Sequence, residues 1–191
     1  MTKTPSSFNK IFWGLLLVLI DFNIIIDILP DIIGYIVITS GLGQLQPHSQ
    51  YFSKAKIFSI LLAIFSLTAI IQGPGIPLNE FQPSNFSLFF MLVTTILGLL
   101  HIVLIFYTFK GFIDMAVKDG LVQLSEIAQK RLFIYIIGAF LPKAAIPFVW
   151  NVGEYGVFYI LSFSIIITVI LEIIILISVR DLRKRYMWID Q

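Results

Sequence analysis

The sequence of 191 residues contains no cysteine and few charged residues. The absence of cysteine excludes disulfides, thiolate metal sites, a cysteine nucleophile and a lipid-modified cysteine. Charged residues make up 13% of the chain and hydrophobic residues 58%, whereas a soluble domain is about 25% charged and about 45–50% apolar. The composition therefore excludes a soluble globular domain, a disordered chain and a coiled coil. It predicts an integral membrane protein with room for about six spans of about 20 residues each.

Residues that signal common cofactor sites are also scarce. The chain has only two histidines, His48 and His101, which are too few and too far apart to indicate zinc. It has no glycine-rich phosphate loop and no nucleic-acid-binding signature. Its formal net charge is only +2. We therefore expect no cofactor, no bound metal and no nucleic-acid partner.

Apolar stretches predict an all-α polytopic bundle that forms a single integral membrane domain over 1–191. One helix over 11–45 would be roughly 52 Å long, although the hydrocarbon core is only about 30 Å thick, so the chain must turn near Pro30. The second helix, of about 15 residues, is short for a full span. The polar stretch 110–131 is expected to be a cytoplasmic loop, part of which lies on the membrane surface as an amphipathic helix. The six predicted transmembrane helices are 8–22, 31–45, 55–71, 85–109, 132–150 and 156–179.

The distribution of positive charge predicts the orientation. If six helices cross the bilayer, all of the thirteen Lys and Arg residues except Lys143 fall on one side. The other side carries acidic residues. Because lysine and arginine are retained in cytoplasmic segments, we expect both the N- and C-termini to be cytoplasmic. The expected location is the plasma membrane of the cell, crossed several times.

Ionisable residues inside the predicted spans are costly and mark candidate sites. Lys143 lies roughly 10 Å below the outer end of its helix at 1.5 Å per residue. Asp21, Asp27 and Asp31 lie in the same outer half. We therefore predict an intramembrane polar site at which Lys143 pairs with one of these aspartates.

A second candidate pair consists of His101 and Glu172. Both lie roughly 21–24 Å below the outer ends of their helices. The two pairs have two interpretations: they are stations along an inner path for a ligand or a proton, or they are ion pairs that hold the bundle together. A further alternative lets Glu172 reach toward Arg180 or toward water among the lipid headgroups.

Two catalytic hypotheses deserve comparison with structural alternatives. Asp27 and Asp31 are four residues apart, as in the carboxylate motifs with which membrane prenyl and alcohol-phosphate transferases hold Mg²⁺ and a diphosphate. Pro30 argues against this, and helix capping is the simpler role. Ser40 and His101 could form an intramembrane serine protease, but the spacing indicates no contact between them and no oxyanion hole. We therefore assign no catalytic residue and no metal ligand.

The segments IDFN (20–23) and DILPDIIGY (27–35) resemble a group of small polytopic membrane proteins of Gram-positive bacteria that have no assigned activity. The resemblance covers the first two helices and implies a bacterial plasma membrane.

In size, helix number and cytoplasmic termini, the chain is also similar to the substrate-binding subunits of energy-coupling-factor vitamin importers. Those subunits dock through an alanine-rich first helix, whereas the first helix here has only Gly14 as a small residue.

The short loops and the lack of a soluble domain or a catalytic constellation favour a non-enzymatic component. Such a protein would work through the lipid bilayer and another membrane protein in assembly, regulation or sensing. The alternative is a small-solute transporter or a substrate-binding membrane subunit, in which Lys143 and the aspartates hold the ligand. An intramembrane enzyme ranks third.

Overall fold

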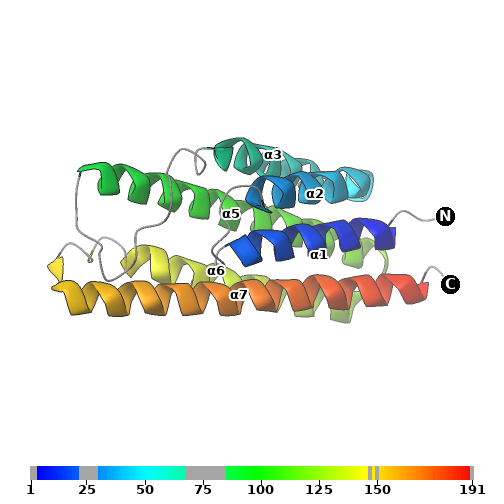
Figure 1. Ribbon diagram of the computed structural model, residues 1–191. Helices are drawn as coiled ribbons and strands as arrows, with labels where there is room; N and C mark the ends of the chain where they lie inside the picture. Colours follow the sequence, from blue (N-terminus) through cyan, green and yellow to red (C-terminus); the bar gives the residue numbers. More distant parts are fainter. Residues whose placement is uncertain (1–3, 22–29, 68–84, 146–147, 149–150, 190–191) are drawn as a thin grey trace.

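A computed structural model describes residues 4–21, 30–67, 85–145, 148 and 151–189. Within these ranges the chain is all-α, with six helices and no strand. Each helix contacts its neighbours along the chain, and α7 packs back against α1, so that the six helices close into a ring. Figure 1 shows this bundle from the side. The helices are α1 (Thr4–Asp21), α2 (Pro30–Leu45), α3 (Gln50–Phe65), α5 (Asn85–Lys118), α6 (Val122–Ala145) and α7 (Glu154–Ile189).

Local signals in the sequence account for several helix ends. Pro30 stands at the first position of α2, where its missing N–H costs no hydrogen bond. Asp31 follows in the first turn, where the helix dipole favours a carboxylate. Ser49 caps α3 by accepting a hydrogen bond from the backbone N–H of Tyr51 at 3.3 Å. Pro142 lies in the last turn of α6 as described, and the predicted helix end at residue 150 lies outside the described residues.

The prediction that the fourth helix ends at residue 109 is wrong, and the stretch 110–131, expected to be only partly helical, is helical on both sides of a short turn. Residues 110–118 continue α5, and 122–131 form the first turns of α6. The backbone N–H of Leu121 donates to the carbonyl of Ala116 at 2.8 Å, and that of Gly120 donates to the carbonyl of Val117 at 3.1 Å. This is a Schellman motif, and Gly120 supplies the positive φ of 74° that it needs. The polar residues of this stretch therefore do not mark the ends of the helices.

The first two helices meet through their glycines. A Cβ on Gly14 would lie 2.6 Å from the carbonyl oxygen of Gly34, and a Cβ on Gly41 would lie 2.8 Å from that of Ser7. Lys10 also donates a hydrogen bond to Ser40 at 3.0 Å. Gly34 and Gly41 of α2 thus pack inside the bundle, against α1, as small residues do where membrane helices approach closely.

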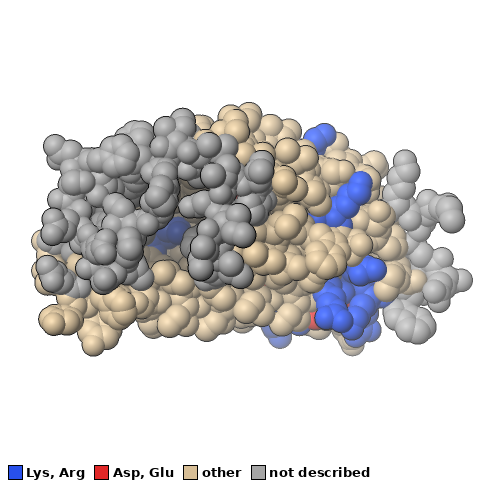
Figure 2. All heavy atoms as spheres, viewed as in Figure 1, with Lys and Arg blue, Asp and Glu red and all other residues tan. Residues whose placement is uncertain are grey.

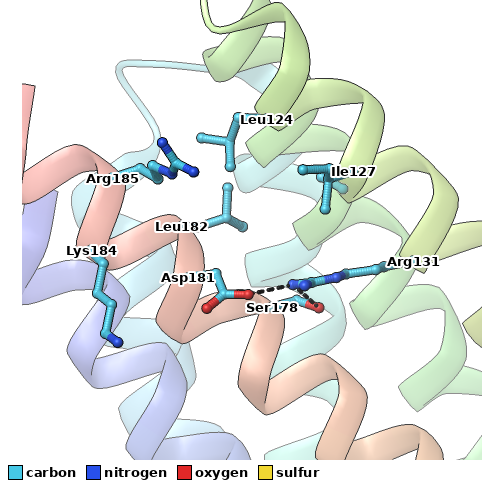
Figure 3. Close-up of a pocket in the computed structure, with 9 residues that line it drawn as sticks. Leu124, Ile127, Arg131, Ser178, Asp181, Leu182, Lys184 and Arg185 are labelled. Carbon is cyan, nitrogen blue, oxygen red and sulfur yellow. Dashed lines mark hydrogen bonds and ion pairs between the residues drawn. The ribbon is translucent and has the colours of Figure 1, made fainter.

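Lys and Arg side chains gather over the end of the bundle at which α1 begins and α7 ends, which we call the basic end (Figure 2). There α6 and α7 are joined by an ion pair, in which Arg131 Nη1 donates to Asp181 Oδ2 at 2.9 Å (Figure 3).

The core of this end is filled by an aromatic plug, defined as Phe8, Phe52, Phe112 and Tyr186. Ring centroids in the plug lie 5.0 to 5.5 Å apart, which is the usual range for packed aromatic pairs.

Two helical segments of the described chain are long and apolar enough to cross a membrane, namely Leu92–Lys118 and Tyr155–Met187. The apolar segments Thr4–Ile20 and Asp31–Leu45 are shorter. Large apolar side chains also point outward on every helix. One from each helix is about half exposed: Trp13, Ile36, Ile57, Ile96, Ile137 and Ile170.

Candidate functional site

A cavity of about 230 Å³ lies among α1, α2, α5, α6 and α7. Val18, Leu19, Leu97, Ile102 and Leu171 form much of its apolar wall. Polar side chains enter it from four helices. They are Asp31 and Tyr35 from α2, Thr94 and His101 from α5, Tyr135 and Lys143 from α6, and Thr168 and Glu172 from α7.

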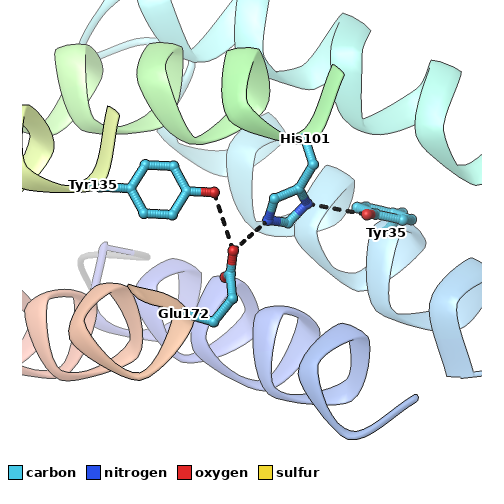
Figure 4. A network of polar contacts seen from close by, with 4 residues as sticks. All are labelled: Tyr35, His101, Tyr135 and Glu172. Carbon is cyan, nitrogen blue, oxygen red and sulfur yellow. Dashed lines mark hydrogen bonds and ion pairs between the residues drawn. The ribbon is translucent and has the colours of Figure 1, made fainter. Parts of the chain in front are cut away.

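Glu172 is the centre of a hydrogen-bonded network in the cavity (Figure 4). His101 Nε2 lies 3.1 Å from Glu172 Oε1, and Tyr135 Oη donates to the same oxygen at 3.0 Å. On the other side of the imidazole, Tyr35 Oη lies 3.0 Å from His101 Nδ1. The structure therefore brings together the second pair expected from the sequence and adds a tyrosine at each end of it.

The hydrogen-bonding roles in the network depend on its groups. An ionised carboxylate only accepts, so in that state His101 Nε2 donates to Glu172 Oε1. The direction of the hydrogen bond between His101 Nδ1 and Tyr35 Oη depends on the tautomer of the imidazole.

A second layer of hydroxyl groups fixes the backbone at Tyr35. Thr39 Oγ1 and Ser59 Oγ each lie 2.8 Å from the carbonyl oxygen of Tyr35, and 2.8 Å from one another. Ser59 is fully buried on α3. Although α3 does not line the cavity, it therefore helps to hold the tyrosine that contacts His101.

Lys143 enters the same cavity beside a glycine of α5. A Cβ placed on Gly98 would lie 2.6 Å from Lys143 Nζ and 2.7 Å from its Cε. The ammonium group therefore occupies space that any larger residue at position 98 would fill. Lys143 is partly buried at this position.

The predicted ion pair between Lys143 and an aspartate is not formed with Asp31. Both residues line the cavity, but no carboxylate oxygen of the described side chains lies within 4.0 Å of Lys143 Nζ. The Asp21 side chain and the whole of Asp27 lie outside the described residues. Lys143, Asp31, His101 and Glu172 nevertheless line one cavity, so the two candidate sites are continuous with each other.

The structure bears differently on the two catalytic hypotheses. Ser40 accepts a hydrogen bond from Lys10, whereas both ring nitrogens of His101 contact Tyr35 and Glu172. A Ser40–His101 dyad is therefore wrong. Of the proposed Mg²⁺ ligands, Asp27 lies outside the described residues. Among the side chains that are described, no group of three His, Asp or Glu residues could hold a metal ion.

Sequence reasoning missed Tyr35, Tyr135 and Gly98. Tyr35 follows Asp31 by one helical turn, and Tyr135 precedes Lys143 by about two turns, so each shares a helix face with an ionisable residue. That spacing is the signal that could have identified them. It is weak here because the chain contains 18 Phe and 7 Tyr, most of which are expected to pack against lipid and neighbouring helices.

No protein-family model, curated protein or solved structure matches the chain. The resemblance noted over 20–35 therefore stays a prediction, and residues 22–29 of that segment lie outside the described ranges. Any functional conclusion must come from the cavity itself.

Proposed function

We propose that the protein is a six-span bundle of the plasma membrane with both termini in the cytoplasm. The exposed apolar side chains on all six helices support this, since a water-soluble bundle would place polar residues there. The basic end supports the orientation, because lysine and arginine are retained on the cytoplasmic side. The shortest helices, α2 and α3, have 16 residues each, or about 24 Å. They reach across most of a hydrocarbon core of about 30 Å.

Within this bundle, the cavity is the binding site for a small solute that carries a carboxylate or a phosphate group. The observation that carries the proposal is the Lys143 ammonium, which enters the cavity with no carboxylate of the described side chains within 4.0 Å. A cation inside a membrane protein is stable only when it is paired or hydrated. An anionic group of a ligand would pair with it.

The rest of the cavity suits a compact polar ligand. Its volume of about 230 Å³ is below the roughly 300–1,000 Å³ typical of sites for drug-sized molecules. Tyr35, His101, Tyr135 and Glu172 hold one another in place, so the ligand meets a rigid polar wall. Preorganisation of this kind lowers the cost of binding.

The packing below the cavity favours binding over an open channel. Ile105, Thr108 and Phe109 of α5 are buried between His101 and the aromatic plug. This layer separates the cavity from the basic end. The geometry thus supports the role of a substrate-binding membrane subunit or a transporter seen in a closed state. The partner-dependent role favoured by the sequence stays a prediction.

Native mass spectrometry of the protein, extracted gently from its own membrane, tests the proposal. The wild-type protein should carry a reproducible extra mass of a few hundred daltons, which is the mass of a small molecule that fits a cavity of this size. Lys143→Met keeps the length of the side chain and removes its charge, so this mass should be lost. Lys130→Met, on an exposed face of the same helix, is the matched control and should retain it.

The thermal midpoint of each variant separates loss of binding from loss of fold. A Lys143→Met protein that folds and still carries the mass would contradict the proposal. A Lys143→Met protein that no longer folds would instead support a structural role for the charge.

A further inference from the structure

A second concave site lies at the basic end, apart from the solute cavity. It is a groove of about 340 Å³ between the first turns of α6 and the last turns of α7. Leu124 and Ile127 of α6 and Leu182 of α7 form its apolar wall, and the side chains of Arg131, Lys184 and Arg185 line it as well. In Figure 3, Leu124 and Leu182 lie between the side chains of Arg185 and Arg131.

One cation of the groove is held in a fixed position. Arg131 Nη1 donates to Asp181 Oδ2 at 2.9 Å and to Ser178 Oγ at 3.2 Å. The other two cations, Lys184 and Arg185, are exposed on α7. Asp181 neutralises one of the three cations, so the groove keeps a formal charge of +2. It therefore combines an excess of positive charge with an apolar wall.

The groove lies where the apolar part of α7 ends. From Ile165 to Val179, the only ionisable residue of α7 is Glu172, and Arg180 is the first of the cations that follow. If α7 crosses the bilayer, as proposed above, the groove lies at the level of the lipid headgroups. Ile127, which is 45% exposed, faces the adjoining acyl chains.

We infer that this groove binds the headgroup phosphate of an anionic phospholipid, whose acyl chains rest on the apolar wall. Charge complementarity argues for an anion, because a zwitterionic headgroup would gain little from the excess of +2. The apolar wall argues for a lipid over a free anion, since only a lipid would cover Leu124 and Ile127. Arginine donors in a fixed orientation suit phosphate oxygens, which accept two parallel hydrogen bonds. The inference depends on the membrane crossing of α7 and not on the solute cavity.

The test uses the purified full-length protein in detergent, with phosphatidylglycerol and phosphatidylcholine of identical acyl chains added together. Native mass spectrometry then counts how much of each lipid stays bound. The double variant Lys184→Gln/Arg185→Gln removes the two free cations of the groove. The double variant Lys130→Gln/Arg180→Gln changes the net charge by the same amount, with one position on α6 and one on α7. Both of its positions are exposed and lie outside the groove.

The wild-type protein should retain phosphatidylglycerol in preference to phosphatidylcholine. That preference should fall by on the order of tenfold or more in the groove variant, and it should stay close to the wild-type value in the control. An equal fall in both variants would show general attraction of anions to the basic end and would overturn the inference. A preference unchanged in the groove variant would overturn it as well. Displacement of the lipid by excess inorganic phosphate, or a dimer in place of the lipid adduct, would assign the groove to another occupant.

Discussion

Replacing Gly14 with alanine should force α1 and α2 apart. The new Cβ would lie 2.6 Å from the carbonyl oxygen of Gly34 and 2.6 Å from a side-chain carbon of Ile38. Because the oxygen belongs to the backbone, rotation of a side chain cannot relieve this contact. To reach the 3.4 Å at which ordinary contact begins, the helices must separate locally by about 0.8 Å.

The energetic cost follows from that displacement. A gap of about 0.5–1 Å removes a quarter to a half of the dispersion energy of each contact that it opens, and overpacked sites typically cost about 1–3 kcal/mol. Alanine regains about 0.5–1 kcal/mol of helix stability relative to glycine. We therefore expect Gly14→Ala to lower the free energy of unfolding by about 1 kcal/mol, since the cost of overpacking exceeds the gain in helix stability.

Reversible unfolding in mixed detergent micelles, followed by circular dichroism, measures this change. Gly43→Ala in α2 is the matched control. Its Cβ would meet only the side chain of Lys56, at 3.6 Å, so this variant should be neutral or slightly more stable than the wild-type protein. If Gly14→Ala were as stable as Gly43→Ala, the close approach of α1 and α2 would be refuted.

Three further substitutions test other parts of the structure in the same unfolding assay. Tyr135→Phe removes the hydroxyl that donates to Glu172 at 3.0 Å and should cost about 1 kcal/mol; an unchanged stability would contradict the buried network. Phe112→Ala removes a fully buried ring from the aromatic plug and should cost about 3–5 kcal/mol, so a loss typical of a surface residue would show that the plug is not packed. Gly120→Ala meets no neighbour within 4 Å but must keep a φ of 74°. It should cost about 1–2 kcal/mol through the backbone alone, and no loss would argue against the Schellman motif.

The contact between His101 and Glu172 could be predicted because helix geometry converts sequence position into depth. Counting 1.5 Å per residue from the outer ends of the helices places both residues at one level. The same counting placed Lys143 near the aspartates, and Asp31 does line the same cavity. It could not show that Lys143 Nζ lies against Gly98 of α5, because depth says nothing about which way a helix is rotated about its axis.

The error over 110–131 has a different cause. Hydropathy reports where a chain leaves the apolar layer, whereas a helix ends where its backbone hydrogen bonds are capped. Here α5 continues to Lys118 and is capped at Gly120. With 34 residues, α5 is about 51 Å long, well beyond the hydrocarbon core. A glycine after a run of helix-forming residues is a recognised stop signal, so Gly120 was the more informative residue in this segment.

Gly98→Ala tests most directly whether the ammonium of Lys143 holds an anionic ligand. The new Cβ would lie 2.6 Å from Lys143 Nζ. Since this is the far end of a flexible side chain, the ammonium should move away while the fold is kept. Alanine should even favour α5 slightly, by up to about 1 kcal/mol.

Native mass spectrometry should therefore show Gly98→Ala folded and without its bound small molecule, because a displaced charge–charge hydrogen bond weakens binding by about tenfold or more. Gly43→Ala, where the new Cβ also faces a lysine but at 3.6 Å, should retain the molecule. A stable Gly98→Ala protein that carries the same bound mass as Gly43→Ala would contradict the claim.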